Sequence, residues 1–497
     1  MSDPSIVPLP GQTLFAPLSS ASRWALAVLL GASLGGCGTE PQVQGRNIVI
    51  VTMDTTRADH LGIYGNTLEL TPRVDALAQT GVVFEDAYAP MPQTLPAHAT
   101  IFTGLLPRDH GALENTYTLD DGYTTLAEIC SDRGYDTGAF IGSLAVDDLT
   151  GIQQGFDTFD QPGGDWGKGR QGHPPQRKAK GVTSAALAWT EQLNGERPYM
   201  LWAHYYDPHG DSNKSFEPPE RHFNAVSREL VLAEVVAREE RFQGVAGVEA
   251  LADFWRGYAA ELRFTDEQIG RLLDGLERQG LLENTVVVVV GDHGEGLFEH
   301  GQKAHGTHLW EEMMRVPLVL VSPDGTAAGT RMAGHATLDD LLPTVMHMAF
   351  GAEHGLPRHG EGLDLWSAIL AGRGLPERPV FLERPHFEAA RLKNRARGQD
   401  LEDFAYGYLT AIVYQDKKLI LFPNGASQLY DLNADPAELT DVSADHPELV
   451  SQLTGRLVDW MAAHKVGAPG ETEVSDERLE HLRELGYLGD DDAGPGR

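Results

Sequence analysis

Several stretches of the chain are continuously apolar, and most of them end in a polar or charged residue. The runs "NIVIVTMD" (47–54) and "TVVVVVGDHGE" (285–295) lack the alternation of a half-exposed strand, so they predict strands buried on both faces. Segments with helical spacing alternate with such runs, including residues 71–81 and the amphipathic stretch 251–280. This alternation predicts an α/β fold, in which a large, mostly parallel sheet is sandwiched by helices. Further strands are expected at "VVFEDAYA", "DTGAFIGS" and "YMLWAHYYDPH".

The alternation of buried strands and helices ends near residue 375. The segments "RPVFLE", "YLTAIVYQDKKLILF" and "SQLYDL" are separated by polar turns and followed by a helical stretch at 447–464. We therefore expect a main domain at 47–375 and a smaller C-terminal subdomain at 376–465, made of an antiparallel sheet and one helix. The glycine- and acid-rich composition of residues 466–497 predicts an acidic tail, in which "DERLEHLRELGYLG" is expected to form a short docking helix.

The N-terminal apolar run "RWALAVLLGASLGGC" has the length of a signal peptide. Its small residues before Cys37 resemble the lipobox of bacterial lipoproteins. This predicts a signal peptide at 1–36, lipidation of Cys37 and a linker at 37–46. The protein would then be exported and lipid-anchored to a membrane, facing the periplasm or the outside. The alternative is an ordinary secretory signal, in which Cys37 has no role. Cys130 is expected to be a packing residue, and two cysteines give no disulfide framework.

Composition narrows the choice of partners. The chain holds 72 acidic and 39 basic residues, a formal net charge of -33. Such a surface repels phosphate backbones and anionic lipid headgroups, so we expect no nucleic-acid partner and membrane contact only through the lipid anchor.

Ionisable residues collect where the predicted strands end. Asp54 follows the first strand, and Asp292 with His293 follows the most apolar one. Asp207 and His209 end the "LWAHYYDPH" strand, and Thr94 enters a helix. Singly, each aspartate is explained equally well as a helix N-cap. Because ligands bind beyond the carboxyl ends of parallel strands, the group as a whole predicts a divalent-metal site there.

At these residues the chain resembles the sulfatase family of the alkaline phosphatase superfamily. The resemblance covers roughly residues 46–490, with the motifs in the family's order. The motifs are "NIVIVTMDTTRADHLGIYG", "TLPAHATIFTGLLPRDHG", "HYYDPH", "GDHGEGLFEHG" and "LWEEMMRVPLVL", with the late "LYDLNADPAE" and "LRELGYL". It implies the sulfatase fold and a hydrolase of sulfuric or phosphoric esters.

The resemblance also implies roles for single residues. Asp54, Asp292 and His293 fall on metal ligands, and Thr94 falls on the nucleophile, where it would also contact the metal. Residues expected to bind the oxygens of the substrate are His209, His305 and, by resemblance to phosphonate- and phosphodiester-cleaving relatives, Asn115. Arg57 matches a common family position without an implied role, and a salt bridge is the simplest interpretation.

Departures from the family pattern affect the chemistry. Thr55 replaces a second ligating aspartate, and Ala97 and His98 replace the Ser-Arg of the motif for formylglycine maturation. Thr94 itself cannot become formylglycine, because its β-carbon carries a methyl group. A threonine ester must be cleared by water attacking sulfur or phosphorus, so we expect a phosphate or phosphonate ester in preference to a sulfate ester. The alternatives are a true sulfatase working without formylglycine and a non-catalytic binding lipoprotein.

The ligand set also bears on the cofactor. Because His293 stands where an oxygen ligand is usual, zinc or manganese is expected in preference to calcium or magnesium. An alternative places a second metal at Asp207, His209 and His305. The proton for the leaving alcohol is expected from His98 or His305. The substrate is expected to be a small-molecule, glycan or lipid ester.

Overall fold

The structure is a computed structural model. It describes residues 45–161, 177–210, 216–242, 247–355, 360–387, 407–467 and 470. The predicted signal peptide, Cys37 and the predicted tail helix lie outside these residues. The domain boundaries given above therefore stay predictions.

The main sheet is built from nine strands among the described residues. They are β1 (Asn47–Met53), β2 (Val82–Tyr88), β3 (Asp136–Phe140), β4 (Thr158–Asp160), β5 (Tyr199–Tyr205), β6 (Thr285–Gly291), β7 (Arg315–Val316), β8 (Leu318–Val321) and β9 (Thr330–Thr337). Their order is β4-β3-β5-β1-β6-β8-β2-β7, and β9 pairs with β2. The run from β4 to β6 is parallel, whereas β8 is antiparallel to both β6 and β2. The predicted fold class, a mostly parallel sheet, is confirmed.

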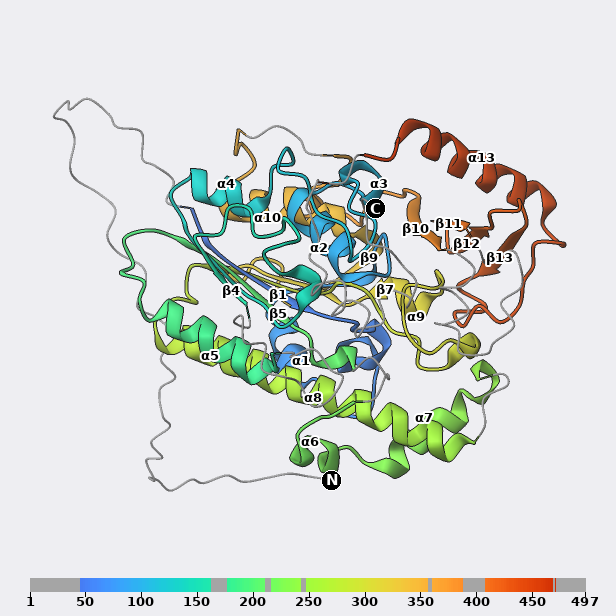
Figure 1. Ribbon diagram of the computed structural model, residues 1–497, viewed down its shortest axis with the longest axis horizontal. Helices are drawn as coiled ribbons and strands as arrows, with labels where there is room; N and C mark the ends of the chain where they lie inside the picture. Colours follow the sequence, from blue (N-terminus) through green and yellow to red (C-terminus); the bar gives the residue numbers. More distant parts are fainter. Residues whose placement is uncertain are drawn as a thin grey trace, which may run out of the picture. The chain divides into compact units, whose positions relative to one another are not determined.

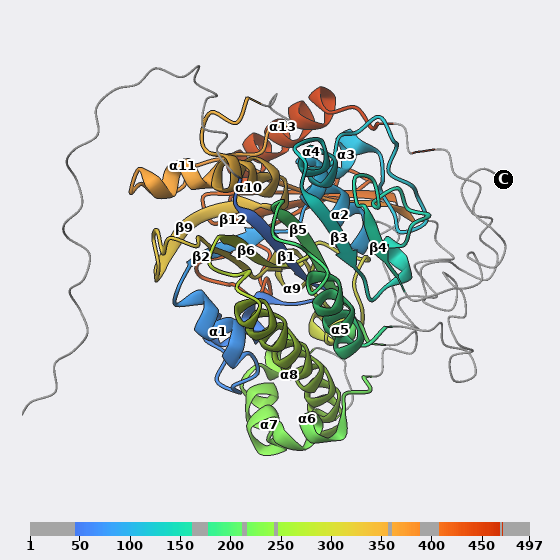
Figure 2. The same cartoon turned by 90° about the vertical axis from the view of Figure 1, so that its left-hand side faces the viewer.

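Burial on both faces explains the continuously apolar strands. In β1, Ile48 and Ile50 join one hydrophobic core, and Val49 and Val51 join the core on the opposite face. Each fully buried side chain of this kind contributes roughly 1.5–3 kcal/mol. One face is covered by α1 (Pro72–Ala78), α5 (Ala179–Thr190) and α8 (Val248–Arg278). The other is covered by α2 (Thr94–Thr103), α4 (Leu126–Asp132) and α10 (Leu341–Phe350) (Figures 1 and 2).

Shorter helices complete this part of the chain. They are α3 (Pro107–His110), α6 (Glu220–Ala225), α7 (Arg228–Ala237), α9 (Glu311–Met314) and α11 (Leu365–Leu370). Across the segments that the structure describes, no helix combines the length and apolar character needed to cross a bilayer.

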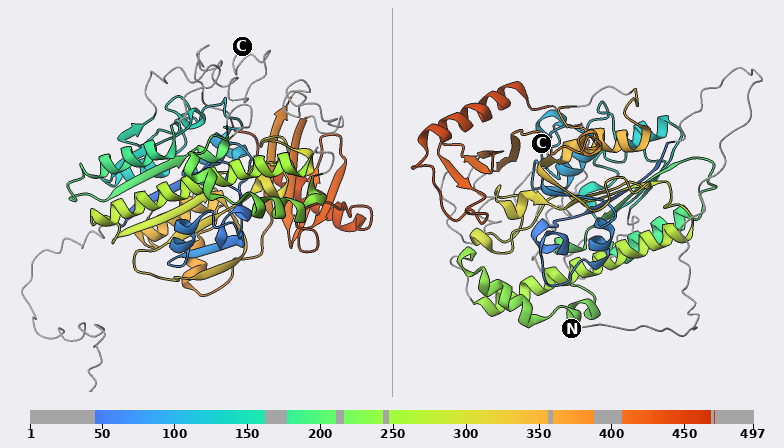
Figure 3. Two further views of the ribbon diagram at one scale, coloured as in Figure 1. Left: turned by 90° about the horizontal axis from the view of Figure 1, so that it is seen from below. Right: turned by 180° about the vertical axis from the view of Figure 1, so that it is seen from behind.

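The C-terminal region forms a separate four-stranded antiparallel sheet under one helix, as predicted (Figure 3). Its elements are β10 (Val380–Phe387), β11 (Gly407–Tyr414), β12 (Lys417–Leu421), β13 (Ser427–Asp431) and α13 (Pro447–Ala463). The run "YLTAIVYQDKKLILF" is split into β11 and β12, because Gln415 and Asp416 both have positive φ and form a tight hairpin turn. The buried Lys418 ammonium lies 3.0 Å from the carboxylates of Glu311 and Glu438, so it ties this sheet to α9.

Candidate active site

The site begins where two neighbouring parallel strands end. β1 and β6 pair in register, with Met53 opposite Gly291, so the next residues of both strands emerge side by side. These residues are Asp54 and Asp292, both fully buried. Gly291 is required at this point, because a Cβ there would lie 2.7 Å from the carbonyl oxygen of Thr56. The sheet register therefore brings the two carboxylates together.

Asp54, Asp292 and His293 form a buried ligand group. One ligand atom from each lies within 4.8 Å of the others, and all three side chains have 0% exposure. The Nδ1–H of His293 donates to the carbonyl of Gly294 at 2.9 Å, so Nε2 keeps its lone pair. That Nε2 lies 3.5 Å from the Oγ1 of Thr94, the first residue of α2. The predicted ligands and the predicted nucleophile thus meet in one place.

The residues in this group fit a divalent cation. The Oδ1 of Asp292 accepts from the backbone N–H groups of Thr55 (3.0 Å) and His293 (2.7 Å). Its Oδ2 is buried and accepts no hydrogen bond from the described residues. Burial raises the pKa of Asp292 well above its usual value, so a cation beside this carboxyl would favour its ionised form. Two carboxylates, an imidazole and a hydroxyl together form a ligand set that can hold a divalent cation.

The backbone beside the group is strained at Thr55. This β-branched residue has φ of 49°, in the left-handed region that such residues rarely adopt. Its hydroxyl is buried without a hydrogen-bond partner among the described residues. Strain of this kind persists where the surroundings impose it, and here it allows the Thr55 N–H to reach Asp292.

Two further imidazoles line up beside His293. The ring centroids of His293 and His305 are 4.5 Å apart, and those of His305 and His209 are 4.9 Å apart. His305 is held by Glu295, whose two carboxylate oxygens both lie 3.3 Å from its Nδ1. Of the three residues predicted to bind substrate oxygens, His305 therefore lies beside the ligand group and His209 lies beside His305. The sequence interpretation missed Glu295, for which the signal was a third ionisable residue in "GDHGE".

His98 lies beneath the site, with both ring nitrogens engaged. Its Nδ1–H donates to the Thr94 carbonyl at 2.7 Å, and its Nε2 lies 3.0 Å from the hydroxyl of Thr52. Burial lowers its pKa to about 4, so the ring is neutral and Nε2 accepts from the Thr52 hydroxyl. This geometry argues against the predicted role of His98 as proton donor, and His305 is left as the candidate. The same Thr52 hydroxyl lies 3.2 Å from His204, whose Nε2 faces Asp54 at 3.6 Å.

Asp207, predicted as a possible ligand of a second metal, contacts the start of a helix. Its Oδ2 accepts from the N–H of Ala179 at 2.7 Å, at the start of α5, and its Oδ1 lies 3.8 Å from Lys178 Nζ. Among the described residues, the only group found that could hold a metal is the one at Asp54, Asp292 and His293. Asp207 thus caps the start of α5. The alternative of a second metal at Asp207, His209 and His305 stays a prediction.

Asn115 lies against the start of α2, close to Thr94. Its Oδ1 accepts from the N–H of Leu95 at 2.8 Å, and its own N–H donates to the Oε1 of Gln93 at 3.2 Å. The side chain is 1% exposed. This predicted substrate-binding residue therefore contacts the backbone of Leu95, the residue that follows Thr94.

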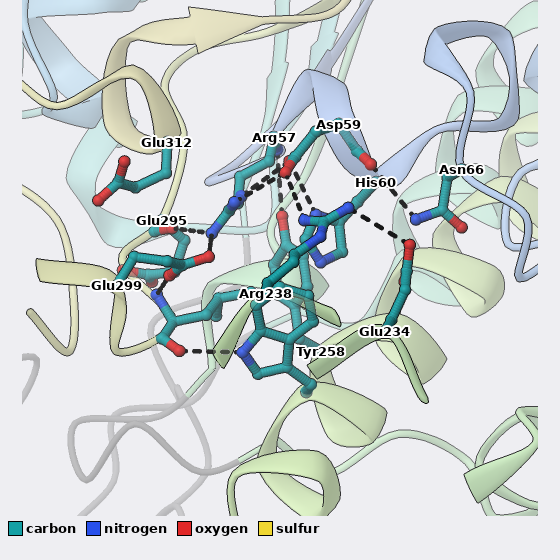
Figure 4. Close-up of polar contacts among 12 residues, drawn as sticks. Arg57, Asp59, His60, Asn66, Glu234, Arg238, Tyr258, Glu295, Glu299 and Glu312 are labelled. Atoms are coloured by element: carbon teal, nitrogen blue, oxygen red, sulfur yellow. Dashed lines mark hydrogen bonds and ion pairs between the residues drawn. The ribbon is translucent and has the colours of Figure 1, made fainter. Parts of the chain in front are cut away.

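Arg57 cross-links the two loops that carry the ligands (Figure 4). Its guanidinium donates to the Glu299 carboxylate at 2.7 Å and to the Glu295 carbonyl at 3.2 Å, and it binds Asp59 through two nitrogens. Burial opposes the charge, but the attraction of Asp59 and Glu299 outweighs it and raises the pKa of Arg57. The hydroxyl of Tyr258, on α8, donates to the Thr55 carbonyl at 2.8 Å. Arg57 is thus a buried cross-brace, consistent with the salt bridge expected from the sequence.

The chain is similar to known proteins along most of its length. The family model described as Sulfatase matches residues 46–352. The N-acetylglucosamine-6-O-sulfatase of Bacteroides thetaiotaomicron is 24% identical, over 92% of this chain and 95% of its own length. The arylsulfatase of Clostridium perfringens is also 24% identical, over 88% and 99%. The crystal structure of the phosphonate monoester hydrolase of Agrobacterium radiobacter superposes with a TM-score of 0.65 at 23% identity, covering 84% of this chain and 96% of that one.

Proposed function

The chain belongs to the sulfatase family, and from that premise we propose that it is a metal-dependent hydrolase of phosphate or phosphonate esters with Thr94 as nucleophile. The observation that carries the proposal is the position of the Thr94 hydroxyl, 3.5 Å from His293 Nε2 at the edge of the buried ligand group. A hydroxyl is a weak nucleophile unless its oxyanion is stabilised, and a cation beside it provides that stabilisation.

The choice of phosphorus over sulfur follows from the threonine. Formylglycine forms from a side chain whose β-carbon bears two hydrogens, and it releases sulfate by re-forming an aldehyde. Thr94 carries a methyl group on that carbon and has no such route. Water must therefore displace the group at phosphorus or sulfur itself, which is ordinary metal-assisted chemistry for a phosphoryl ester.

The residues of the site divide the reaction between them. When bound, a divalent cation at Asp54, Asp292 and His293 supplies Lewis acidity that favours the deprotonated hydroxyl. Thr94 Oγ1 loses its proton to solvent water and bonds to phosphorus as the bond to the leaving alcohol breaks. His305, oriented by Glu295, donates the proton that the alcohol takes away.

Water then attacks phosphorus, breaks its bond to Thr94 and gives one of its protons to Thr94 Oγ1. Through both steps His209 and Asn115 stabilise charge on the oxygens that do not take part in bond breaking. The substrate class is a small-molecule, glycan or lipid ester.

Hydrolysis of a sulfate ester is the second candidate. Both curated relatives are named as sulfatases, and a tetrahedral sulfate ester would meet the same donors. Purified, zinc- or manganese-loaded protein offered an aryl sulfate, an aryl phosphate, a phosphodiester and an aryl phosphonate would separate the two. Turnover of the phosphorus esters supports the proposal, and turnover of the sulfate alone overturns it.

A non-catalytic binding lipoprotein is the remaining alternative. A decayed site would come up empty in metal analysis of the isolated protein and would turn over none of these esters.

As a further part of the proposal, the protein is exported and anchored through lipid on Cys37, which the signal-peptide pattern supports.

A further inference from the structure

Gln93 directly precedes the proposed nucleophile and occupies the N-cap position of α2. Its side chain makes no capping hydrogen bond to the helix. Instead, its Oε1 accepts from the backbone N–H of Asn115 at 3.2 Å. Because a backbone N–H can only donate, this contact fixes which end of the amide is oxygen. The Nε2 of Gln93 must therefore point elsewhere.

That nitrogen is a buried donor. Gln93 is 2% exposed, and its Nε2 has no hydrogen-bond partner among the described residues. Asn115 repeats the arrangement: its Oδ1 is fixed by the Leu95 N–H, and its Nδ2 is likewise buried without a described partner. One of these –NH₂ groups belongs to the residue before Thr94, and the other to the side chain that binds the backbone N–H of the residue after it.

Buried donors are matched by acceptors in folded proteins, and an unmatched one is unfavourable. Two such donors beside a nucleophile are satisfied by an acceptor that arrives with the substrate. The oxygens of a phosphoryl or sulfuryl group only accept hydrogen bonds, and they gain negative charge when Thr94 attacks.

We propose that Gln93 is a substrate-binding residue, whose Nε2 donates to an oxygen of the ester group beside Asn115 Nδ2. The inference rests on the proposed function, because it takes the ester to be bound at Thr94. It adds a donor to the site and explains why a buried glutamine precedes the nucleophile.

Two substitutions test the donor directly. Gln93→Glu keeps an oxygen for the Asn115 N–H and the shape of the side chain, but it replaces the donor and adds charge. Gln93→Met keeps neutrality and length, but it removes both donor and acceptor. Each is compared with wild type for kcat/KM on the best ester probe, at equal metal content and with unchanged circular dichroism.

Loss of the donor predicts that both variants fall roughly 10- to 100-fold in kcat/KM. A fall in Gln93→Met alone would assign Gln93 to holding Asn115, and a fall in Gln93→Glu alone would reduce the effect to repulsion by the new charge. Either result, or full activity in both, overturns the inference.

Binding of inorganic phosphate, measured by calorimetry on metal-loaded protein, separates this inference from the proposed function. Weaker phosphate binding in both variants supports the donor even if no ester is turned over, in which case only the proposed function fails. Ester turnover with phosphate binding and kcat/KM unchanged in both variants leaves the function standing and removes Gln93 from the site.

Discussion

The buried cross-brace at Arg57 gives the sharpest test of how the site is held. In Arg57→Met the apolar stem is kept, and the charge and its donors are removed. The Glu299 side chain, 2% exposed, then loses the cation 2.7 Å away. The Glu295 carbonyl loses a donor in the same step, and Glu295 is the residue that orients His305.

The expected loss of stability comes mainly from Glu299. Removing one partner of a buried ion pair costs about 3–5 kcal/mol, because the other charge stays buried. Asp59 adds little: its side chain is 34% exposed and keeps Arg238 at 2.9 Å, and an exposed pair contributes about 0–1 kcal/mol. We therefore expect Arg57→Met to lower the free energy of unfolding by about 3–5 kcal/mol.

Arg238 offers a matched control, because it also pairs with Asp59 and also stacks on Trp255. It does not reach Glu299, and Arg238→Met should cost about 1 kcal/mol or less. Urea unfolding followed by tryptophan fluorescence gives the midpoints for comparison. In the double variant Arg57→Met/Glu299→Gln part of the loss should be recovered. Equal losses in the two arginine variants would refute the reasoning.

Four other expectations can be checked directly. Thr94→Ala should lower kcat by several orders of magnitude, whereas Thr94→Ser keeps a hydroxyl and should keep measurable turnover in the ester assay; full activity in Thr94→Ala would exclude the nucleophile role. Removing metal with a chelator should lower the thermal midpoint of unfolding and abolish turnover. Adding zinc or manganese at a hundred times its Kd should restore about 2.7 kcal/mol of stability, and the Asp292→Asn variant should gain less from the added metal. His300 donates to Glu312 at 2.9 Å and to a backbone carbonyl, which raises its pKa to about 9 against burial, while the same pair lowers the pKa of Glu312 to about 2. The stability gained from the raised pKa of His300 is complete below about pH 6.5 and is lost as the pH rises towards 9. The stability gained from the lowered pKa of Glu312 is lost as the pH falls below about 4.5. The His300→Gln variant should therefore lose up to about 3 kcal/mol of unfolding free energy between about pH 4.5 and 6.5, and less at lower or higher pH. Cys37→Ser should move the exported protein from the membrane fraction to the soluble fraction, and unchanged fractionation would remove the lipid anchor.

The sequence predicted the fold because the relevant signals are local. A strand buried on both faces must be apolar at every position, and β1 and β6 are. A helix such as α8 carries its period in its own residues, and the predicted stretch 251–280 differs from Val248–Arg278 only at the ends. The sequence pattern did not predict that the run "YLTAIVYQDKKLILF" divides into β11 and β12. The division depends on Gln415 and Asp416, whose positive φ no hydrophobic pattern encodes.

The ligand group could also be predicted from the sequence, since parallel strands bring their carboxyl ends to one edge and Asp54, Asp292 and His293 follow such strands. The direction in which a polar side chain points at that edge could not be predicted. Asp207 also follows a strand, yet it caps α5, and His98 lies one turn after Thr94, yet its ring turns into the core towards Thr52.

The α/β fold class, the family resemblance and the metal-ligating candidates could thus be predicted from the amino-acid sequence alone, because they depend on residue types and spacings within single segments. The tertiary structure alone decided that Arg57 joins two loops, that Glu295 holds His305 and that Gln93 buries a donor that no described residue accepts from. Each of these depends on contacts between segments far apart in the chain, where packing sets the rotamer of every side chain.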